Sequence, residues 1–215
     1  SSAARSMRFS FFANYRRGHT EPSGAPRGAH FTVAIIRTLS YDSSVSTAQI
    51  HIRQLAPSEA AAYREIRLEA LRSSPEAFGS TFEAESERPL ERFRERLTNS
   101  PVFGAFLNAE LVGIAGFMRR EGAKDAHKAM LWGMYVRAGS RKAGVGRRLA
   151  EAVIDFARQH VETLQLTVVS DNEPARHLYA SLGFVEYGIE RNALKQDGRY
   201  YDEVLMAKDL RPESK

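Results

Sequence analysis

The sequence predicts an α/β (α+β) fold with a central mixed, mostly antiparallel twisted sheet that about four helices flank. Strand and helix patterns alternate from about residue 49 onward, which favours helices packed on one sheet. Two pairs of strand patterns are separated by short polar turns, and hairpins of this kind are antiparallel. A strand, a helix and another strand follow one another over residues 130–169, and such a crossover joins parallel strands.

Composition excludes several classes of protein. Residues 1–48 contain six arginines against Glu21 and Asp42, whereas residues 49–215 carry 25 basic and 24 acidic side chains, a net charge of +1. Because the basic excess lies mostly outside the predicted domain, we do not expect nucleic acid as a partner. No apolar run reaches membrane-spanning length, so we expect no membrane association. The absence of cysteine excludes disulfides, thiolate metal sites and a cysteine nucleophile, and we expect a cytoplasmic protein.

The first 48 residues differ in composition from the rest. They are rich in Ser, Arg, Gly and Pro, and residues 21–28 have the composition of a loop. A short apolar run over residues 31–36 could form a strand, although it has no evident partner. We expect residues 1–48 to be a disordered or loosely packed N-terminal extension, with a transit peptide as the alternative. Residues 49–215 then form the domain.

The first part of this domain reads as a strand followed by two helices. Residues 49–55 alternate in polarity, which is typical of a strand. Ser58 is expected to cap a helix that ends before Pro75. Residues 76–88 lack periodicity and read as a linker, and residues 89–98 form a second, short helix.

Two strands, over residues 102–107 and 111–118, are expected to form a hairpin around residues 108–110. A polar connection over residues 119–129 leads to the next strand.

The centre of the chain combines a strand, a glycine turn and a helix. Residues 130–136 form an apolar run, residues 141–146 form a basic turn with two glycines, and the apolar positions of residues 145–156 repeat with helical spacing. This order presents bare backbone N–H groups at a helix N-terminus, where anions bind.

The last part of the chain continues with a strand, a helix and a hairpin. We expect a strand over residues 164–169 and a helix over residues 173–182, which Gly183 ends. Strands over residues 184–194 and 200–208 follow, with Asp197-Gly198 in the turn between them.

Two common phosphate-binding loops do not fit the glycine turn. Gly139 and Gly144 have the spacing of a P-loop, but Val145 stands where its lysine is required. The dinucleotide fingerprint needs a third glycine, and Leu149 occupies that position. The turn therefore belongs to another class of anion site, or is only a left-handed turn with solvated basic residues.

A third pattern fits. Arg141-Lys142-Ala143-Gly144-Val145-Gly146-Arg147 resembles the R/Q-x-x-G-x-G/A signature of the GNAT acyltransferase family, and residues 172–184 resemble its second block, N-x-x-A-x-x-x-Y-x-x-x-G-F. The resemblance covers about residues 49–210. It implies a GNAT-like fold and an N-acetyltransferase that moves an acetyl group from acetyl-CoA directly to a primary amine of a small molecule or peptide, without a metal. The alternative is a catalytically inactive acyl-CoA-binding regulatory module.

The resemblance also implies which residues bind the cosubstrate. Two glycines leave room for a pyrophosphate, the helix dipole attracts it, and basic side chains of the turn add charge. The strand before the turn would pair its main chain with the pantetheine arm. The residues so implied are Met134, Tyr135, Val136, Arg141, Lys142, Ala143, Gly144, Val145, Gly146, Arg147, Asn172 and Tyr179.

Tyr179 occupies the position of the family tyrosine near the thioester sulfur. Its implied role is that of a general acid for the departing thiolate. A tyrosine packed against the sheet is the simpler interpretation, just as Asn172 could be only a helix cap.

The general base is not evident. The strand over residues 130–134 carries no carboxylate, so the candidates are Glu83, Glu85, Asp125 and His127. We favour Glu83, although any one of the four could equally be a solvated surface charge.

Aromatic residues could line the acceptor site. Phe78, Trp132 and Tyr201, with Tyr200 beside it, are the candidates, although aromatic residues more often fill the core. Glu203 lies on the same predicted strand as Tyr201 and could face a cationic amine. Exposed sheet edges could also pair in a homodimer.

Overall fold

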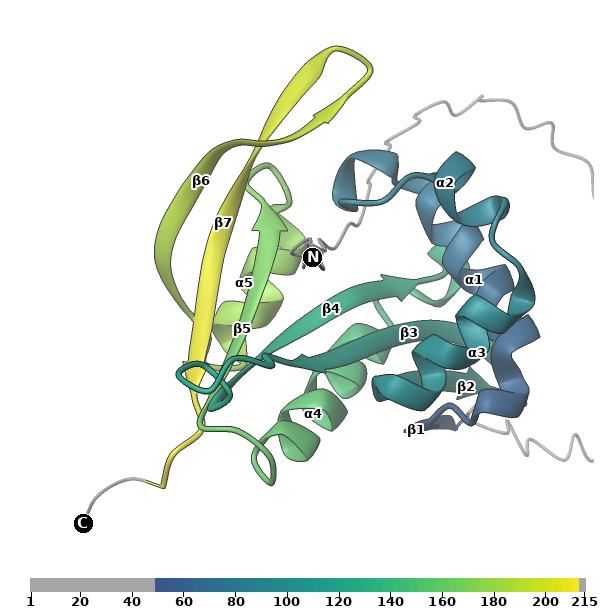
Figure 1. The fold of residues 1–215 in the computed structure, drawn as a ribbon, viewed down its shortest axis with the longest axis horizontal. Helices are drawn as coiled ribbons and strands as arrows, with labels where there is room; N and C mark the ends of the chain where they lie inside the picture. Colours follow the sequence, from purple (N-terminus) through teal and green to yellow (C-terminus); the bar gives the residue numbers. More distant parts are fainter. Residues whose placement is uncertain (1–48, 213–215) are drawn as a thin grey trace, which may run out of the picture.

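The computed structural model describes residues 49–212 (Figure 1). The predictions for residues 1–48, including the strand over residues 31–36, lie outside the described residues. A seven-stranded sheet in the order β1-β2-β3-β4-β5-β7-β6 forms the centre of the described part. The strands are β1 (Ile50–Gln54), β2 (Val102–Leu107), β3 (Glu110–Arg119), β4 (Lys128–Val136), β5 (Thr163–Val169), β6 (Val185–Gln196) and β7 (Arg199–Asp209).

The direction of the strands confirms the predicted sheet. β4 and β5 run parallel, joined by the crossover helix, and every other neighbouring pair is antiparallel. β1 and β6 are the two edge strands. The sheet is therefore mixed and mostly antiparallel.

Helices cover both faces of the sheet. They are α1 (Ala60–Ser73), α2 (Phe82–Ser86), α3 (Leu90–Asn99), α4 (Val145–Ala157) and α5 (Glu173–Ser181), with 3-10 turns η1 (Pro57–Glu59), η2 (Pro75–Ala77) and η3 (Ala138–Ser140). Apolar residues of α4 and α5 form one core with the sheet, and those of α1 and α3 form a second core on the opposite face of β2, β3 and β4. Figure 1 shows α1, α2 and α3 grouped together, while the β6–β7 hairpin extends beyond the rest of the sheet.

Both predicted hairpins have two-residue turns. The φ angles are 48° at Asn108 and 67° at Ala109, and 50° at Asp197 and 80° at Gly198. Two consecutive positive φ angles define the type I′ turn, whose twist matches that of paired strands. Asp and Gly tolerate this conformation well, which is why the second hairpin gave the clearer sequence signal.

Two local predictions were wrong. Ser58 does not cap α1, because it lies inside η1, and Glu59 precedes the helix instead. The Glu59 carboxylate accepts a hydrogen bond from the Ala56 N–H at 2.8 Å and pairs with Arg53 at 2.7 Å. The linker expected over residues 76–88 contains α2, which Thr81 caps through its side-chain oxygen. A cap followed by acidic residues in the first turn is a recognisable signal for this helix.

Candidate functional site

β4 and β5 pair only over the first three residues of each strand and then separate. Their register runs through Lys128–Thr163 and Ala129–Leu164 and ends at Met130–Gln165, although β4 continues to Val136 and β5 to Val169. Figure 1 shows the two strands diverging toward their carboxyl ends. The remainder of β4, residues 131–136, therefore presents an edge that β5 does not cover.

A β-bulge in β4 accounts for the divergence. In the pairing with β3, Tyr135 lies opposite Ile114 and Trp132 lies opposite Gly116, so β4 has one extra residue in this interval. Gly133 has a φ of +62°, which favours glycine. A bulge bends the strand that contains it and increases its twist, and this turns the end of β4 away from β5.

The uncovered edge of β4 exposes main-chain polar groups. The Arg137 N–H donates to the Val112 carbonyl at 2.9 Å, so the main chain of the preceding residue, Val136, faces the opposite edge. There the Val136 carbonyl accepts a hydrogen bond from Arg141 Nε at 2.9 Å. By the same alternation Met134 faces this edge. An extended ligand with amide groups can pair with such an edge as a further strand would.

The glycine turn ends at the N-terminus of α4. Gly144 precedes the helix with φ 79° and ψ 0°, as the left-handed conformation predicted for the turn requires. The first hydrogen bond of α4 runs from the Arg148 N–H to the Gly144 carbonyl at 3.1 Å. The N–H groups of residues 145–147 therefore have no acceptor within the helix and can bind an anion.

The basic side chains near the turn also contact the protein. Arg147 donates to Ser181 Oγ at 2.7 Å and lies 3.6 Å from Glu151. Arg141 bonds the end of β4, as described above. The backbone N–H groups are therefore the more direct anion-binding groups, and the arginines add positive charge around them.

We expect Gly144→Val to weaken coenzyme A binding about tenfold or more. A β-branched residue in the left-handed conformation costs about 1–2 kcal/mol, so the turn would relax and its N–H groups would no longer converge. Calorimetric titration with coenzyme A measures this effect. Gly139→Ala is the matched control, because a Cβ at Gly139 meets nothing within 4 Å and Gly139 has no positive φ. Equal affinities in the Gly144 variant and the control would contradict the assignment.

Asn172 precedes α5 as its N-cap, and Tyr179 lies on this helix, which follows β5. The Asn172 N–H donates to the Val169 carbonyl at 2.9 Å, and Asn172 Oδ1 accepts from the Ala175 N–H at 3.3 Å, so Asn172 caps the helix as predicted. Tyr179 is 1% exposed and contacts Phe184 edge to face. Burial raises the pKa of the Tyr179 phenol well above its usual value. The phenol is therefore protonated at neutral pH, as a general acid must be.

The residues predicted as bases are not brought to one place. Glu83 is exposed in the first turn of α2. Asp125 and His127 precede the first residue of β4, at the opposite end of that strand from the glycine turn. A strand of this length spans roughly 25 Å, which separates both residues from the anion site.

Glu85 has a structural role. Its carboxylate is buried and contacts Arg67 at 2.8 Å and Arg96 at 3.2 Å. Burial alone would raise the pKa of Glu85, but the hydrogen bonds and positive charges of the two arginines outweigh this and lower the pKa to about 2. So acidic a group is a weak proton acceptor. The ion pairs join α1, α2 and α3.

The aromatic residues predicted for the acceptor site also lie in different parts of the structure. Trp132 lines a pocket between α3 and the sheet. Phe78 is buried in the core, with the Arg67 guanidinium 4.9 Å from the centre of its ring. Tyr201 lies on β7, where the Arg199 guanidinium is 4.8 Å from its ring. Only Trp132 of these three lines that pocket.

The structure gives Glu203 a buried, hydrogen-bonded position that the sequence did not predict. It lies on β7 with no exposed surface, and its Oε1 accepts a hydrogen bond from Thr167 Oγ1 at 3.0 Å. Its register partner on β5 is Val169, at the diverging end of that strand. A carboxylate is thus fixed beside the strand that leads into α5.

Sequence reasoning missed Arg137. This side chain contacts three carboxylates, those of Glu65 at 3.2 Å, Glu69 at 2.8 Å and Glu110 at 2.6 Å. It thereby attaches the end of β4 to α1 and to the β2–β3 hairpin. The signal available in the sequence is an arginine directly after a buried strand, but its partners are remote in the chain.

Among residues 49–212, no group of three or more His, Asp or Glu side chains is arranged to hold a metal ion. No helix in the same range is both long and apolar enough to cross a membrane.

Diverging parallel strands beside a free helix N-terminus can accommodate an extended ligand with an anionic group. Comparison with known proteins identifies the family. The model of the Acetyltransferase (GNAT) family matches residues 64–184, and the chain belongs to this family.

Three relatives illustrate the similarity. The chain is 34% identical over 106 residues to N-alpha-acetyltransferase RimI of Mycobacterium tuberculosis. The aligned residues make up 49% of this chain and 64% of that protein. It is 37% identical over 81 residues to the ribosomal protein bS18-alanine N-acetyltransferase of Escherichia coli K12, 37% of this chain and 55% of that protein. These matches span less than two thirds of either relative. A solved ribosomal-protein-alanine N-acetyltransferase from Brucella melitensis has a TM-score of 0.63 at 26% identity, covering 74% of this chain and 99% of that one.

Proposed function

We propose that this protein is an N-acetyltransferase that transfers an acetyl group from acetyl-CoA directly to a primary amine, with a peptide N-terminus as the acceptor. The observation that supports it most is the uncovered edge of β4 beside the free N-terminus of α4. The family uses acetyl-CoA as its cosubstrate. The names of three relatives describe N-acetylation, two of them of a ribosomal-protein alanine.

The residues present fit acetyl-CoA. Its pantetheine arm carries amides that the main chain of Met134 and the N–H of Val136 can pair with, because the Val136 carbonyl already accepts from Arg141. Its pyrophosphate suits the N–H groups of residues 145–147. Arg141, Lys142 and Arg147 surround the turn with positive charge. When bound, acetyl-CoA supplies the acetyl group as an activated thioester.

Two protons must move during transfer. Tyr179 holds the first on its phenol oxygen and would donate it to the leaving thiolate, and burial keeps the phenol protonated until that step. The amine must lose the second. We assign that proton to the Glu203 carboxylate, because Thr167 fixes it beside the end of β5. Glu83 stays a prediction, and its exposed position supports it less.

A thiol-release assay tests this proposal, with mass spectrometry of the acceptor. We expect release of coenzyme A to match acetylation of an alanine-terminated peptide, and a much slower reaction with small amines. Glu203→Gln should lower the rate about 100-fold or more and Glu83→Gln should not. Tight acetyl-CoA binding without transfer to any amine would instead indicate an inactive acyl-CoA-binding module.

A further inference from the structure

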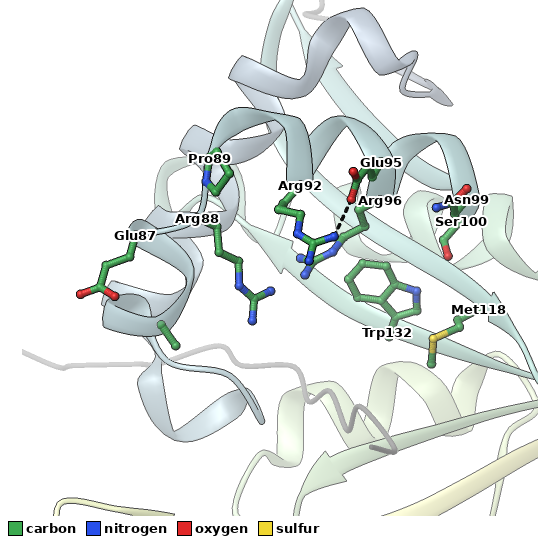
Figure 2. Close-up of a pocket in the computed structure, with 11 residues that line it drawn as sticks. Glu87, Arg88, Pro89, Arg92, Glu95, Arg96, Asn99, Ser100, Met118 and Trp132 are labelled. Carbon is green, nitrogen blue, oxygen red and sulfur yellow. Dashed lines mark hydrogen bonds and ion pairs between the residues drawn. The ribbon is translucent and has the colours of Figure 1, made fainter. Parts of the chain in front are cut away.

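A pocket of about 670 Å³ lies between the α2–α3 segment and strands β3 and β4 (Figure 2). Arg88, Arg92 and Arg96 line it at intervals of four residues. Met118 and Trp132 line it from the sheet. Figure 2 shows the three guanidinium groups on the side of α3 that faces the indole ring. The pocket therefore combines positive charge with apolar side chains of the sheet.

The positive charge of this pocket is only partly neutralised. Arg96 contacts Glu85 at 3.2 Å, and Arg92 contacts Glu95 at 2.9 Å. The second pair is well exposed, and such pairs contribute little and exchange readily for other partners. In residues 49–212 no ion pair involves Arg88. Glu87 also lines the pocket, with its carboxylate pointing away from the arginines in Figure 2.

Trp132 occupies a defined position against the sheet. Its side chain is 4% exposed, and the Arg96 guanidinium lies 5.7 Å from its ring. A Cβ at Gly116 would be 2.3 Å from the indole, so glycine makes room for it. Guanidinium groups bind planar carboxylates well, because an arginine can donate two parallel hydrogen bonds to one carboxylate.

The pocket adjoins the proposed acetyl-transfer site. Trp132 and Met134 belong to the same strand, two residues apart, which is about 7 Å in extended chain. An extended peptide also advances about 3.3 Å per residue. A peptide whose amino group lies at the edge of β4 can therefore place side chains of its next few residues among the arginines.

We propose that this pocket binds carboxylate side chains close to the amino terminus of a peptide acceptor, and so selects acidic N-termini. The inference rests on the proposed acetyl transfer. The near-neutral charge of residues 49–215 and the glutamates around the pocket favour isolated carboxylates over a nucleic acid.

Tryptophan fluorescence tests the proposal without catalysis, because Trp132 is the single tryptophan of the chain. The full chain is titrated with two peptides of equal length that both begin with alanine. The acidic peptide has Asp and Glu residues at positions 2–4, and the neutral peptide has Asn and Gln residues there. We expect the acidic peptide to bind at least tenfold more tightly than the neutral peptide, and its affinity to fall as the salt concentration rises. Arg88→Gln and Arg92→Gln should each reduce its affinity at least fivefold.

Arg94→Gln is the matched control, because Arg94 lies on α3 with Arg92, pairs with Glu91 and does not line the pocket. Its affinity for the acidic peptide should equal that of the unmodified protein. Equal binding of both peptides, or equal losses in the Arg88, Arg92 and Arg94 variants, would overturn the proposal. Acetylation of both peptides at equal rates would overturn this selectivity but not the acetyl transfer. Acidic-peptide binding without any acetylation would support the pocket and overturn the proposed function.

Discussion

Tyr179→Phe is expected to lower kcat about 10²- to 10⁴-fold and to leave the affinity for coenzyme A within about twofold. The substitution keeps the ring that packs against Phe184 and removes only the proton donor. A thiolate that leaves without receiving a proton is a poorer leaving group, so the loss falls on the chemical step. Steady-state thiol release and calorimetric titration separate the two effects.

The pH dependence of the reaction gives a second readout for Tyr179. A general acid must be protonated, so activity is lost as the pH rises through its pKa. Burial raises the pKa of this phenol, which moves the loss to higher pH than an exposed tyrosine would give. Tyr187→Phe is the matched control, since this phenol is 56% exposed on β6. If the Tyr179 and Tyr187 variants were equally active, Tyr179 would have no role in proton transfer.

Glu85→Ala is expected to lower the free energy of unfolding by about 3–5 kcal/mol. The variant leaves Arg67, which has no exposed surface, and Arg96, which is 14% exposed, without the carboxylate that neutralises them. Removing one partner of a buried ion pair costs far more than losing a surface pair. Urea denaturation followed by circular dichroism measures the change. Glu83→Ala, on the exposed side of the same helix, should change the stability by less than about 0.5 kcal/mol.

Acid should have a related effect on the unmodified protein. The pKa of Glu85 is lowered from its usual value to about 2 in the folded state, so its contribution is complete above the unfolded-state pKa near 4.5. That contribution is lost as the pH falls from about 5 toward 2. The Glu85→Ala variant should therefore lose less stability than the unmodified protein over this interval. Parallel losses in both proteins would contradict the role assigned to Glu85.

The sequence predicted the parts of the fold that local patterns determine. The strand over residues 102–107 matches β2, and the helix beginning at Val145 matches α4. The Asp197-Gly198 turn was equally clear, because few residues adopt two successive positive φ angles. These features depend on hydrophobic periodicity and on the residue types in turns, and both can be read from a short stretch of sequence.

The divergence of β4 from β5 could not be predicted in this way. Gly133 lies in an apolar run that reads as an ordinary buried strand. The bulge exists because β3 pairs with β4 in a register that leaves one residue over. Register depends on residues that are distant in the sequence, and only the structure shows it.

The same distinction separates the two sides of the site. The glycine turn and Tyr179 belong to local motifs and were predicted by resemblance, and their roles stay proposals. On the acceptor side, Glu85 reads as a solvated charge until Arg67 and Arg96 are seen to enclose it. Arg88 likewise reads as the end of a polar linker, because the sequence does not show that Trp132 lines the same pocket.

The most direct test concerns the place where acetyl-CoA binds. Hydrogen–deuterium exchange of the full chain, with and without saturating acetyl-CoA, measures the protection of each backbone segment. We predict slower exchange at residues 133–136 and 144–148, and unchanged exchange in β1 at the far edge of the sheet. Unchanged exchange at both predicted segments, or protection confined to other elements, would contradict the binding of acetyl-CoA between the diverging strands.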